Sequence, residues 1–314
     1  MNKHSRIKPP ASLLERANEL YDFGAALRGP AKATAPAEPP VAEPVEVPDH
    51  APFPAAPAAA PIAAPGVPPP AARQTSGHAK VRAHIDREAL RAANYIDPEG
   101  PVTGLSEEFR IVKRQLLLAA RGGKGFDPIE HGERILICSA NPNEGKTFCA
   151  INLALSMATE KDNRVLLVDA DFAKPSILAR LGIEGGRGLM DALADPSIDV
   201  EDLVIETDIA GLSILPAGAQ TNQDTEYLAA ARTAALLDQL TRHDPSRIII
   251  FDSPPALAAS PASVLALHVG QAVMVVHADV TTDNALRDAL SLLSGCENIQ
   301  LLLNRTKFSP TGRK

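Results

Sequence analysis

The sequence has 314 residues and a formal net charge of −7, and 28 of its residues are proline. This acidic balance disfavours non-specific binding to nucleic acid, because such binding needs a basic surface that displaces phosphate counterions. No apolar run reaches the roughly 18 residues of a transmembrane helix, and the polar start of the chain carries no signal-peptide core. Three cysteines without paired or metal-site spacing, Cys138, Cys149 and Cys296, indicate reduced thiols in a cytoplasmic protein.

The first 77 residues divide into two segments of different composition. Residues 1–28 contain a predicted amphipathic helix, Ala11–Arg28, which opens with the capping-box residues Ser12 and Glu15. An isolated helix of this length is marginal in water, so we expect it to dock on the main domain or on a partner. Residues 29–77 are rich in proline and alanine and poor in large apolar side chains. We predict that this segment is a disordered, extended linker.

Residues 78–132 are predicted to form a helical segment ahead of the main domain. Arg82–Asn94 has the pattern of a short helix. A second helix, Leu105–Leu118, has Ser106 as its candidate cap and one apolar face that consists of Phe109, Val112 and Leu116. A glycine-rich loop, Arg121–Gly132, then leads into the main domain.

From residue 133 to residue 306, short apolar runs alternate with helical patterns. Most runs are continuous, as is typical of strands buried on both faces of a parallel sheet. The predicted strands are Ile135–Cys138, Val165–Val168, Leu212–Leu215, Ile248–Phe251, Ala272–Val276 and Leu301–Leu303. The predicted helices are Lys146–Thr159, Thr225–Thr241, Pro261–His268 and Thr282–Ser294. This alternation predicts an α/β fold, a three-layer α/β/α sandwich with a mostly parallel central sheet, followed by a flexible tail at 307–314.

The first predicted strand runs into the loop S-A-N-P-N-E-G-K-T at 139–147, and a helix follows. The loop fits the P-loop pattern G-x-x-x-x-G-K-[ST], except that Ala140 replaces the first glycine. Backbone N–H groups at such a helix start form a concavity that binds phosphate, and Asn143 is expected to adopt a positive φ there. We expect Lys146 to bridge the β- and γ-phosphates and the Thr147 hydroxyl to ligate Mg²⁺. The predicted nucleotide-binding residues of this loop are Asn141, Pro142, Asn143, Glu144, Gly145, Lys146, Thr147 and Phe148.

Two more predicted strands end in carboxylates. Asp169 and Asp171 are spaced i, i+2 and so point to the same face, where one would hold a Mg²⁺ water and the other would orient the nucleophile. Four apolar residues precede Asp252, as in a Walker B strand whose carboxylate supports Mg²⁺ through water. Functional groups of open α/β sheets gather at the carboxyl ends of the strands. The sequence therefore predicts a P-loop NTPase that binds ATP and Mg²⁺, with catalytic residues Lys146, Asp169, Asp171 and Asp252, and with Thr147, Asp169 and Asp252 near the metal.

The three motifs resemble those of the bacterial tyrosine kinases (BY-kinases) of capsule and exopolysaccharide synthesis, over about Leu105–Thr306. The resemblance is strongest to the exosortase-associated tyrosine autokinase branch. The family's first motif, [AS]-x-x-P-x-x-G-K-[ST], accommodates Ala140 and Pro142. Its second and third motifs match Asp169, Asp171, Lys174 and Pro175, and Asp252–Pro255.

This resemblance implies further roles. The family's E-x-x-R-x-x-R helix builds a ring, and the similar residues here are Glu107, Arg110 and Lys113, so we expect a ring or a smaller oligomer weakened by a lysine that cannot make a bidentate contact. Asn304 and Arg305 are implied to lie near the adenine. The family's C-terminal tyrosine cluster is absent, which leaves Tyr21 and Tyr95 in the flexible N-terminal part as conceivable acceptors and Tyr227 as structural.

The main functional hypothesis is an ATP-dependent protein-tyrosine kinase that regulates exopolysaccharide polymerisation and export. Asp169 would accept or orient the tyrosine proton, with Asp171 and Asp252 on the metal side. An alternative is a kinase-deficient ATPase switch that docks on the cytoplasmic tail of a membrane-bound polysaccharide co-polymerase, which would recruit the chain to the inner face of the plasma membrane. A third hypothesis, a partition- or division-type Walker ATPase, is disfavoured because Asn141 stands where those proteins carry an extra lysine.

Overall fold

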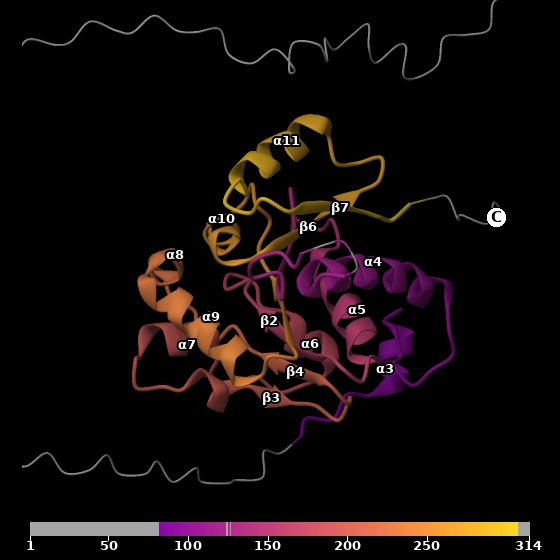
Figure 1. Ribbon diagram of the computed structural model, residues 1–314, viewed down its shortest axis with the longest axis horizontal. Helices are drawn as coiled ribbons and strands as arrows, with labels where there is room; N and C mark the ends of the chain where they lie inside the picture. Colours follow the sequence, from indigo (N-terminus) through magenta and orange to yellow (C-terminus); the bar gives the residue numbers. More distant parts are fainter. Residues whose placement is uncertain (1–81, 124, 126, 307–314) are drawn as a thin grey trace, which may run out of the picture. The chain divides into compact units, whose positions relative to one another are not determined.

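The computed structural model describes residues 82–123, 125 and 127–306; the predicted helix within 1–28, the linker 29–77 and the tail 307–314 lie outside these residues. A seven-stranded sheet forms the middle layer of the described part (Figure 1). Neighbouring strands are parallel except at one edge, where β3 runs antiparallel to β4. Across the sheet the strands are β3 (Ile205–Glu206), β4 (Leu212–Leu215), β2 (Arg164–Asp169), β5 (Arg247–Asp252), β1 (Arg134–Ser139), β6 (Gln271–His277) and β7 (Ile299–Asn304).

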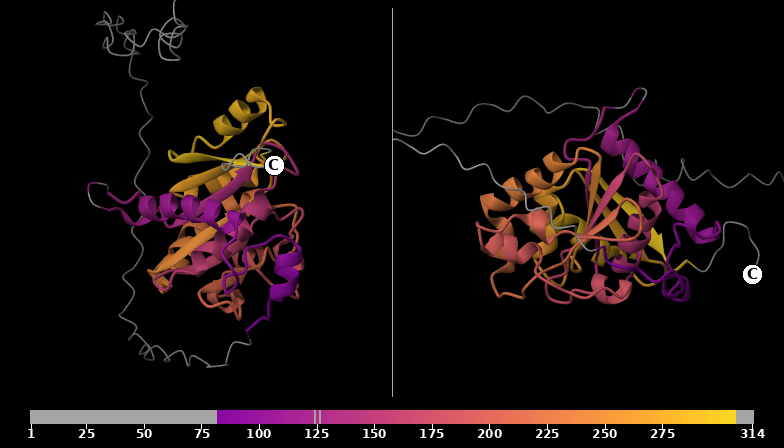
Figure 2. Two further views of the ribbon diagram at one scale, coloured as in Figure 1. Left: turned by 90° about the vertical axis from the view of Figure 1, so that its right-hand side faces the viewer. Right: turned by 90° about the horizontal axis from the view of Figure 1, so that it is seen from below.

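The helices form two layers, one on each face of the sheet (Figure 2). Helices α3 (Arg87–Ala92), α4 (Gly104–Arg121), α5 (Lys146–Ala158) and α6 (Ile177–Leu181) pack on one face. Helices α7 (Leu189–Ala194), α8 (Asp224–Ala229), α9 (Ala231–His243), α10 (Pro261–Leu265) and α11 (Asp283–Leu292) pack on the other, with the short 3₁₀ turns η1 (Val200–Leu203) and η2 (Ala266–His268). The predicted three-layer α/β/α sandwich with a mostly parallel sheet is confirmed.

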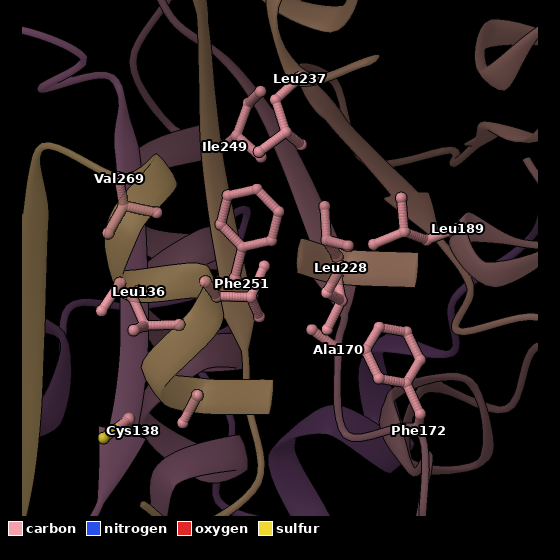
Figure 3. Packing of buried hydrophobic residues seen from close by; sticks show 14 of the residues in the cluster. Leu136, Cys138, Ala170, Phe172, Leu189, Leu228, Leu237, Ile249, Phe251 and Val269 are labelled. Carbon is pink, nitrogen blue, oxygen red and sulfur yellow. The ribbon is translucent and has the colours of Figure 1, made fainter. Parts of the chain in front are cut away.

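The central strands β1, β2 and β5 are apolar between their end residues because both of their faces are covered. Every residue of β1 and of β5 is buried. Consecutive side chains alternate between the layers, so that Leu136 packs with the α7–α11 layer and Ile137 with the α3–α6 layer. Figure 3 shows Leu136 and Phe251, from neighbouring strands, in the same apolar layer as Leu237 of α9. All six predicted strands are present, whereas β3, with only two half-buried residues, was not predicted.

Two predicted helices, Arg82–Asn94 and Thr225–Thr241, differ most from the observed ones. Arg82–Asn94 contains only the short helix α3. This helix begins late because the Asp86 carboxylate accepts hydrogen bonds from the Glu88 and Ala89 N–H groups and so caps its first turn. The predicted helix Thr225–Thr241 is broken between α8 and α9 at Ala230, which is extended (φ −71°, ψ 148°). At this break the carbonyl oxygen of Tyr227 accepts from the Thr233 hydroxyl at 2.9 Å and from the Ala230 N–H at 3.2 Å.

The second predicted helix of the pre-core segment is present and is longer than predicted. Its N-cap is Thr103, and the predicted cap Ser106 completes a capping box with it at the third helical position. Phe109 and Leu116 are buried on the predicted apolar face, and Val112 packs partly buried beside them. This face lies against α5, the helix that follows the P-loop.

The segment before α4 packs along the domain. Ala83 bridges Thr207 next to β3, and the Ile85 N–H donates to the Asp208 carboxylate at 3.0 Å. Further along, the Ile96 N–H donates to the Asn152 side chain of α5 at 2.8 Å. These bonds attach residues 83–96 to two distant parts of the main domain.

The three cysteines, Cys138, Cys149 and Cys296, are free and buried, as expected for reduced thiols. Among the described helices, none combines the length and the apolar character needed to cross a membrane.

Candidate nucleotide site

The P-loop connects the carboxyl end of β1 to the first turn of α5. Asn143 has φ 64°, as predicted, and Gly145 has φ 102°. Two residues of positive φ close together fold the backbone tightly, and such curvature lets successive N–H groups converge on an anion. Pro142 and Asn143 are exposed at the outer turn of the loop, whereas Glu144 and Thr147 are buried.

Lys146 brings the three sequence motifs together. Its Nζ lies 2.7 Å from Asp171 Oδ2, 3.4 Å from the Thr147 hydroxyl and 3.9 Å from Asp252 Oδ1. Asp171 follows β2, Asp252 ends β5, and Lys146 opens α5 after β1, so that three neighbouring strands contribute to one edge of the sheet. This is the convergence that the strand order predicts for an open α/β sheet.

Asp252 is the most deeply buried carboxylate of the site, with no exposed surface. Among the described residues neither of its oxygens has a hydrogen-bond partner of ordinary geometry, although the Thr147 hydroxyl is close enough to lower its pKa. Burial raises the pKa of Asp252 to about 7, and the charge of Lys146 opposes this rise. A buried carboxylate with open acceptor positions fits a hydrated cation, which would restore the charge balance.

Asp169 has a different environment from Asp171. Its Oδ2 accepts hydrogen bonds from the N–H groups of Ser176 and Ile177, at 2.8 and 3.0 Å, and so holds the start of α6. Its Oδ1 accepts from the Asp171 N–H at 3.3 Å, and burial raises its pKa. Asp171, and not Asp169, is therefore the acid that contacts Lys146.

The carboxylates do not form a metal site by themselves. Among the described residues, no three Asp, Glu, His or Cys side chains are close enough together to hold an ion. Mg²⁺ in proteins commonly uses one or two carboxylates together with waters and substrate phosphates. The Thr147 hydroxyl and the Asp252 carboxylate fit such a partial ligand set.

Two predicted nucleotide-binding residues, Phe148 and Glu144, have side chains that contact other parts of the protein. The Phe148 ring stacks on Tyr95 with ring centroids 5.5 Å apart, which leaves only its backbone for a ligand. The Glu144 carboxylate accepts from the Asn141 N–H at 3.0 Å and from the Thr281 hydroxyl at 2.6 Å. Thr281 was not predicted, because no local pattern points to a contact across 137 residues of sequence.

Asn304 and Arg305 lie at the end of β7, beside the P-loop. Asn304 Nδ2 donates to the carbonyl oxygen of Glu144 at 2.9 Å. Arg305 is exposed and has φ 58°. Their contact with adenine stays a prediction, whereas the contact of Asn304 with the loop is direct.

The three residues predicted for oligomerisation are not equivalent. Glu107 and Arg110 are exposed on α4 and pair with each other at 2.6 Å. Lys113 is buried, and its Nζ lies 3.0 Å from Glu160 Oε1. Of the three, only Glu107 and Arg110 are exposed, and the role of all three residues in oligomerisation stays a prediction.

The expectation that Tyr95 lies in a flexible part of the chain is wrong. Tyr95 is 6% exposed, it stacks on Phe148, and its hydroxyl accepts a hydrogen bond from Arg180 of α6 at 3.2 Å. Tyr227 packs partly buried against the core, as predicted, and Tyr21 lies outside the described residues. Tyr95 is thus inaccessible as an acceptor in this conformation.

The sheet order, the strand–loop–helix motif and the converging lysine and carboxylates define a P-loop nucleotide-binding domain. Residues 133–306 match the AAA domain family over more than half of the chain. The chain belongs to this family.

The predicted resemblance to bacterial tyrosine kinases is confirmed by the comparisons. The chain is 30% identical over 158 residues to the tyrosine-protein kinase wzc of Salmonella typhimurium, which covers 50% of this chain and 21% of that protein. It is 27% identical over 227 residues to the tyrosine-protein kinase YwqD of Bacillus subtilis, which covers 71% of this chain and 91% of that protein. The crystal structure of the VpsO kinase domain has a TM-score of 0.53 and 30% identity, over 64% of this chain and 96% of that chain. The chain thus spans about a fifth of the length of wzc and most of YwqD.

Proposed function

We propose that this chain binds ATP with Mg²⁺ and transfers the γ-phosphoryl group to a protein tyrosine. The observation that carries the proposal is the position of Lys146 Nζ, 2.7 Å from Asp171 Oδ2 and 3.9 Å from Asp252 Oδ1. These are the charged groups that phosphoryl transfer needs around its transition state. The kinase names of the relatives support tyrosine as the acceptor.

Each residue has a role that follows from its surroundings. Bound Mg²⁺ supplies positive charge that neutralises the phosphoryl oxygens. Thr147 and Asp252 would hold it, because both are buried beside Lys146 at the loop and the carboxylate lacks other partners. Lys146 would exchange its ion pair with Asp171 for the phosphate oxygens, which frees Asp171 for the metal side of the site.

The proton of the attacking tyrosine hydroxyl would pass to Asp169 while the Oη–P bond forms and the bond to the leaving phosphate breaks. Burial raises the pKa of Asp169, which strengthens it as a base. Its Oδ1 accepts one long hydrogen bond of 3.3 Å and keeps a free lone pair, whereas Oδ2 is occupied by two N–H groups.

The burial of the described tyrosines favours a second function, an ATPase switch that does not phosphorylate tyrosine. Tyr95 is buried and Tyr227 is partly buried, so the described residues contain no fully exposed acceptor. In that case ATP binding would drive docking on the tail of a membrane-bound polysaccharide co-polymerase at the inner face of the plasma membrane. Self-association through Glu107 and Arg110 would accompany either function in exopolysaccharide assembly.

Phosphopeptide mass spectrometry separates the two functions. The purified full chain is incubated with ATP and Mg²⁺, alone and with a candidate co-polymerase tail, and Lys146→Ala is the matched control. Phosphotyrosine that depends on Lys146 supports the kinase. ATP turnover without phosphotyrosine supports the switch, and an unchanged ATP affinity of Lys146→Ala contradicts the site itself.

A further inference from the structure

Glu144 lies within the P-loop, yet its carboxylate is turned into the protein. The residue is 3% exposed, and the carboxylate accepts hydrogen bonds from the Asn141 N–H at 3.0 Å, the Asn141 side-chain amide at 3.3 Å and the Thr281 hydroxyl at 2.6 Å. A buried carboxylate is tolerated only when such donors compensate its lost hydration. The orientation of the Glu144 carboxylate therefore depends on these donors.

The Thr281 hydroxyl has a fixed orientation. It accepts a hydrogen bond from the His277 N–H at the end of β6, at 2.9 Å. A hydroxyl has one proton, and a backbone N–H can only donate, so the Thr281 proton is directed to Glu144 Oε1. The bond of 2.6 Å is thus a charge-assisted hydrogen bond between the end of β6 and the P-loop.

Asn304, at the end of β7, binds the backbone of the same loop residue, Glu144. Its Oδ1 accepts from the Arg305 N–H at 2.9 Å, which directs its Nδ2 to the carbonyl oxygen of Glu144. A Cβ atom at Gly145 would lie 2.1 Å from this Nδ2. The Asn304 amide therefore packs directly on the glycine that the loop requires.

These contacts surround the strained part of the loop. Asn143 and Gly145, on either side of Glu144, both have positive φ, which is costly for Asn143 unless its surroundings fix it. Without the Thr281 hydroxyl, the Glu144 carboxylate loses its shortest hydrogen bond and can rotate out of its pocket. A carboxylate that turns toward the phosphate concavity would repel a bound phosphate.

We propose that Thr281 and Asn304 are positioning residues that hold the P-loop in its phosphate-binding shape through Glu144. This inference rests on the proposed nucleotide binding. It assigns to the ends of β6 and β7 a role in phosphate affinity, separate from any contact with the base.

The test compares Thr281→Val with Thr282→Val in the full chain. Thr282 is adjacent and caps α11 through the Ala285 N–H, and none of its described hydrogen bonds reaches the P-loop. Affinities for MgATP and for Mg-tripolyphosphate are measured by competition with a fluorescent ADP analogue, and melting temperatures are measured in parallel. Thr281→Ser, which keeps the hydroxyl, is the rescue variant.

We expect Thr281→Val to lower the affinity for both ligands by about tenfold, which is the usual effect of losing a hydrogen bond to a charged group. Thr281→Ser should restore the affinity, and Thr282→Val should lower the melting temperature with affinity within about twofold of the parent. Asn304→Ala should lower the affinity for tripolyphosphate as much as the affinity for ATP. A loss of affinity confined to ATP would instead show that Asn304 contacts the adenine base.

Equal affinities of Thr281→Val and the parent would overturn the role of Thr281. Failure of the parent chain to bind either ligand would instead refute the proposed function.

Discussion

The ammonium group of Lys113 on α4 donates a hydrogen bond to the carbonyl oxygen of Ser156 in the last turn of α5, at 2.8 Å. It also donates to the Thr159 hydroxyl at 3.1 Å. A cation at a helix C-terminus satisfies carbonyl groups that have no helical partner and interacts favourably with the helix dipole. Lys113 therefore fastens α4 to the helix that carries Lys146 and Thr147 at its other end.

Replacing Lys113 with methionine keeps the aliphatic stem and removes this cap. We expect the free energy of unfolding to fall by about 1–3 kcal/mol, because the charged hydrogen bond to the buried Ser156 carbonyl is lost together with the ion pair to Glu160. Urea denaturation measures the change. Arg114→Met is the matched control, because Arg114 is exposed on the same helix and should change stability by no more than about 0.5 kcal/mol. Equal stabilities of the two variants would contradict the capping role.

The exposed pair Glu107 and Arg110 allows a test of the predicted oligomer. Each single charge reversal, Glu107→Arg or Arg110→Glu, breaks the pair within α4 and any contact with a neighbouring subunit. The double reversal restores the pair within the helix. If an oligomer forms through these residues, sedimentation velocity should show dissociation in both single variants, while Lys113→Met stays assembled. Identical sedimentation of all variants and the parent would exclude this face as the interface.

Asp252 makes the stability of the nucleotide-free chain depend on pH. Its pKa rises from 3.8 in the unfolded chain to about 7 in the folded one, so the folded state binds more protons between these values. Stability contributed by the protonated form is therefore lost as pH rises from about 4 to about 7, with a slope of at most about 1.4 kcal/mol per pH unit. Asp252→Asn cannot ionise, so it should gain stability relative to the parent over this range.

Urea denaturation of Asp252→Asn and of the parent at pH 5, 6, 7 and 8 measures this difference. Above the raised pKa the difference should reach a plateau. Asp238→Asn is a suitable control, because the hydrogen bond from Arg134 lowers the pKa of Asp238 and so places its titration below this range. A difference that is constant from pH 5 to pH 8 would show that Asp252 is already ionised at pH 5.

The strands and the three motifs could be predicted because their signals are local. Continuous apolar runs identify buried strands, and Lys146 and Asp252 follow directly from loop and strand patterns. The different contacts of Asp169 and Asp171 could not be predicted. They depend on which of the two carboxylates accepts hydrogen bonds from the start of α6 and which one contacts Lys146. The burial of Lys113 could not be predicted for a similar reason: a charged residue on a helix is expected at the surface, and its partners at the end of α5, Ser156 and Thr159, are 43 and 46 residues away.

Tyr95 offers the last test, because it contacts both the P-loop helix and α6. Tyr95→Phe keeps the stack on Phe148 and removes only the hydroxyl that accepts from Arg180, so it should cost about 0.5–1.5 kcal/mol. Tyr95→Ala also removes a buried ring and should cost about 3–5 kcal/mol. Thermal and urea unfolding of both variants measure these losses.

The same residue tests the assignment of the phosphate acceptor. In the native chain Tyr95 is 6% exposed, so phosphopeptide analysis after incubation with ATP and Mg²⁺ should find it unmodified. The native chain should also resist an added, unrelated tyrosine kinase at Tyr95, because residues 83–96 would first have to open locally. Phosphorylation of Tyr95 in the native chain would show that residues 83–96 detach from α5 under native conditions, and would return Tyr95 to the set of acceptors.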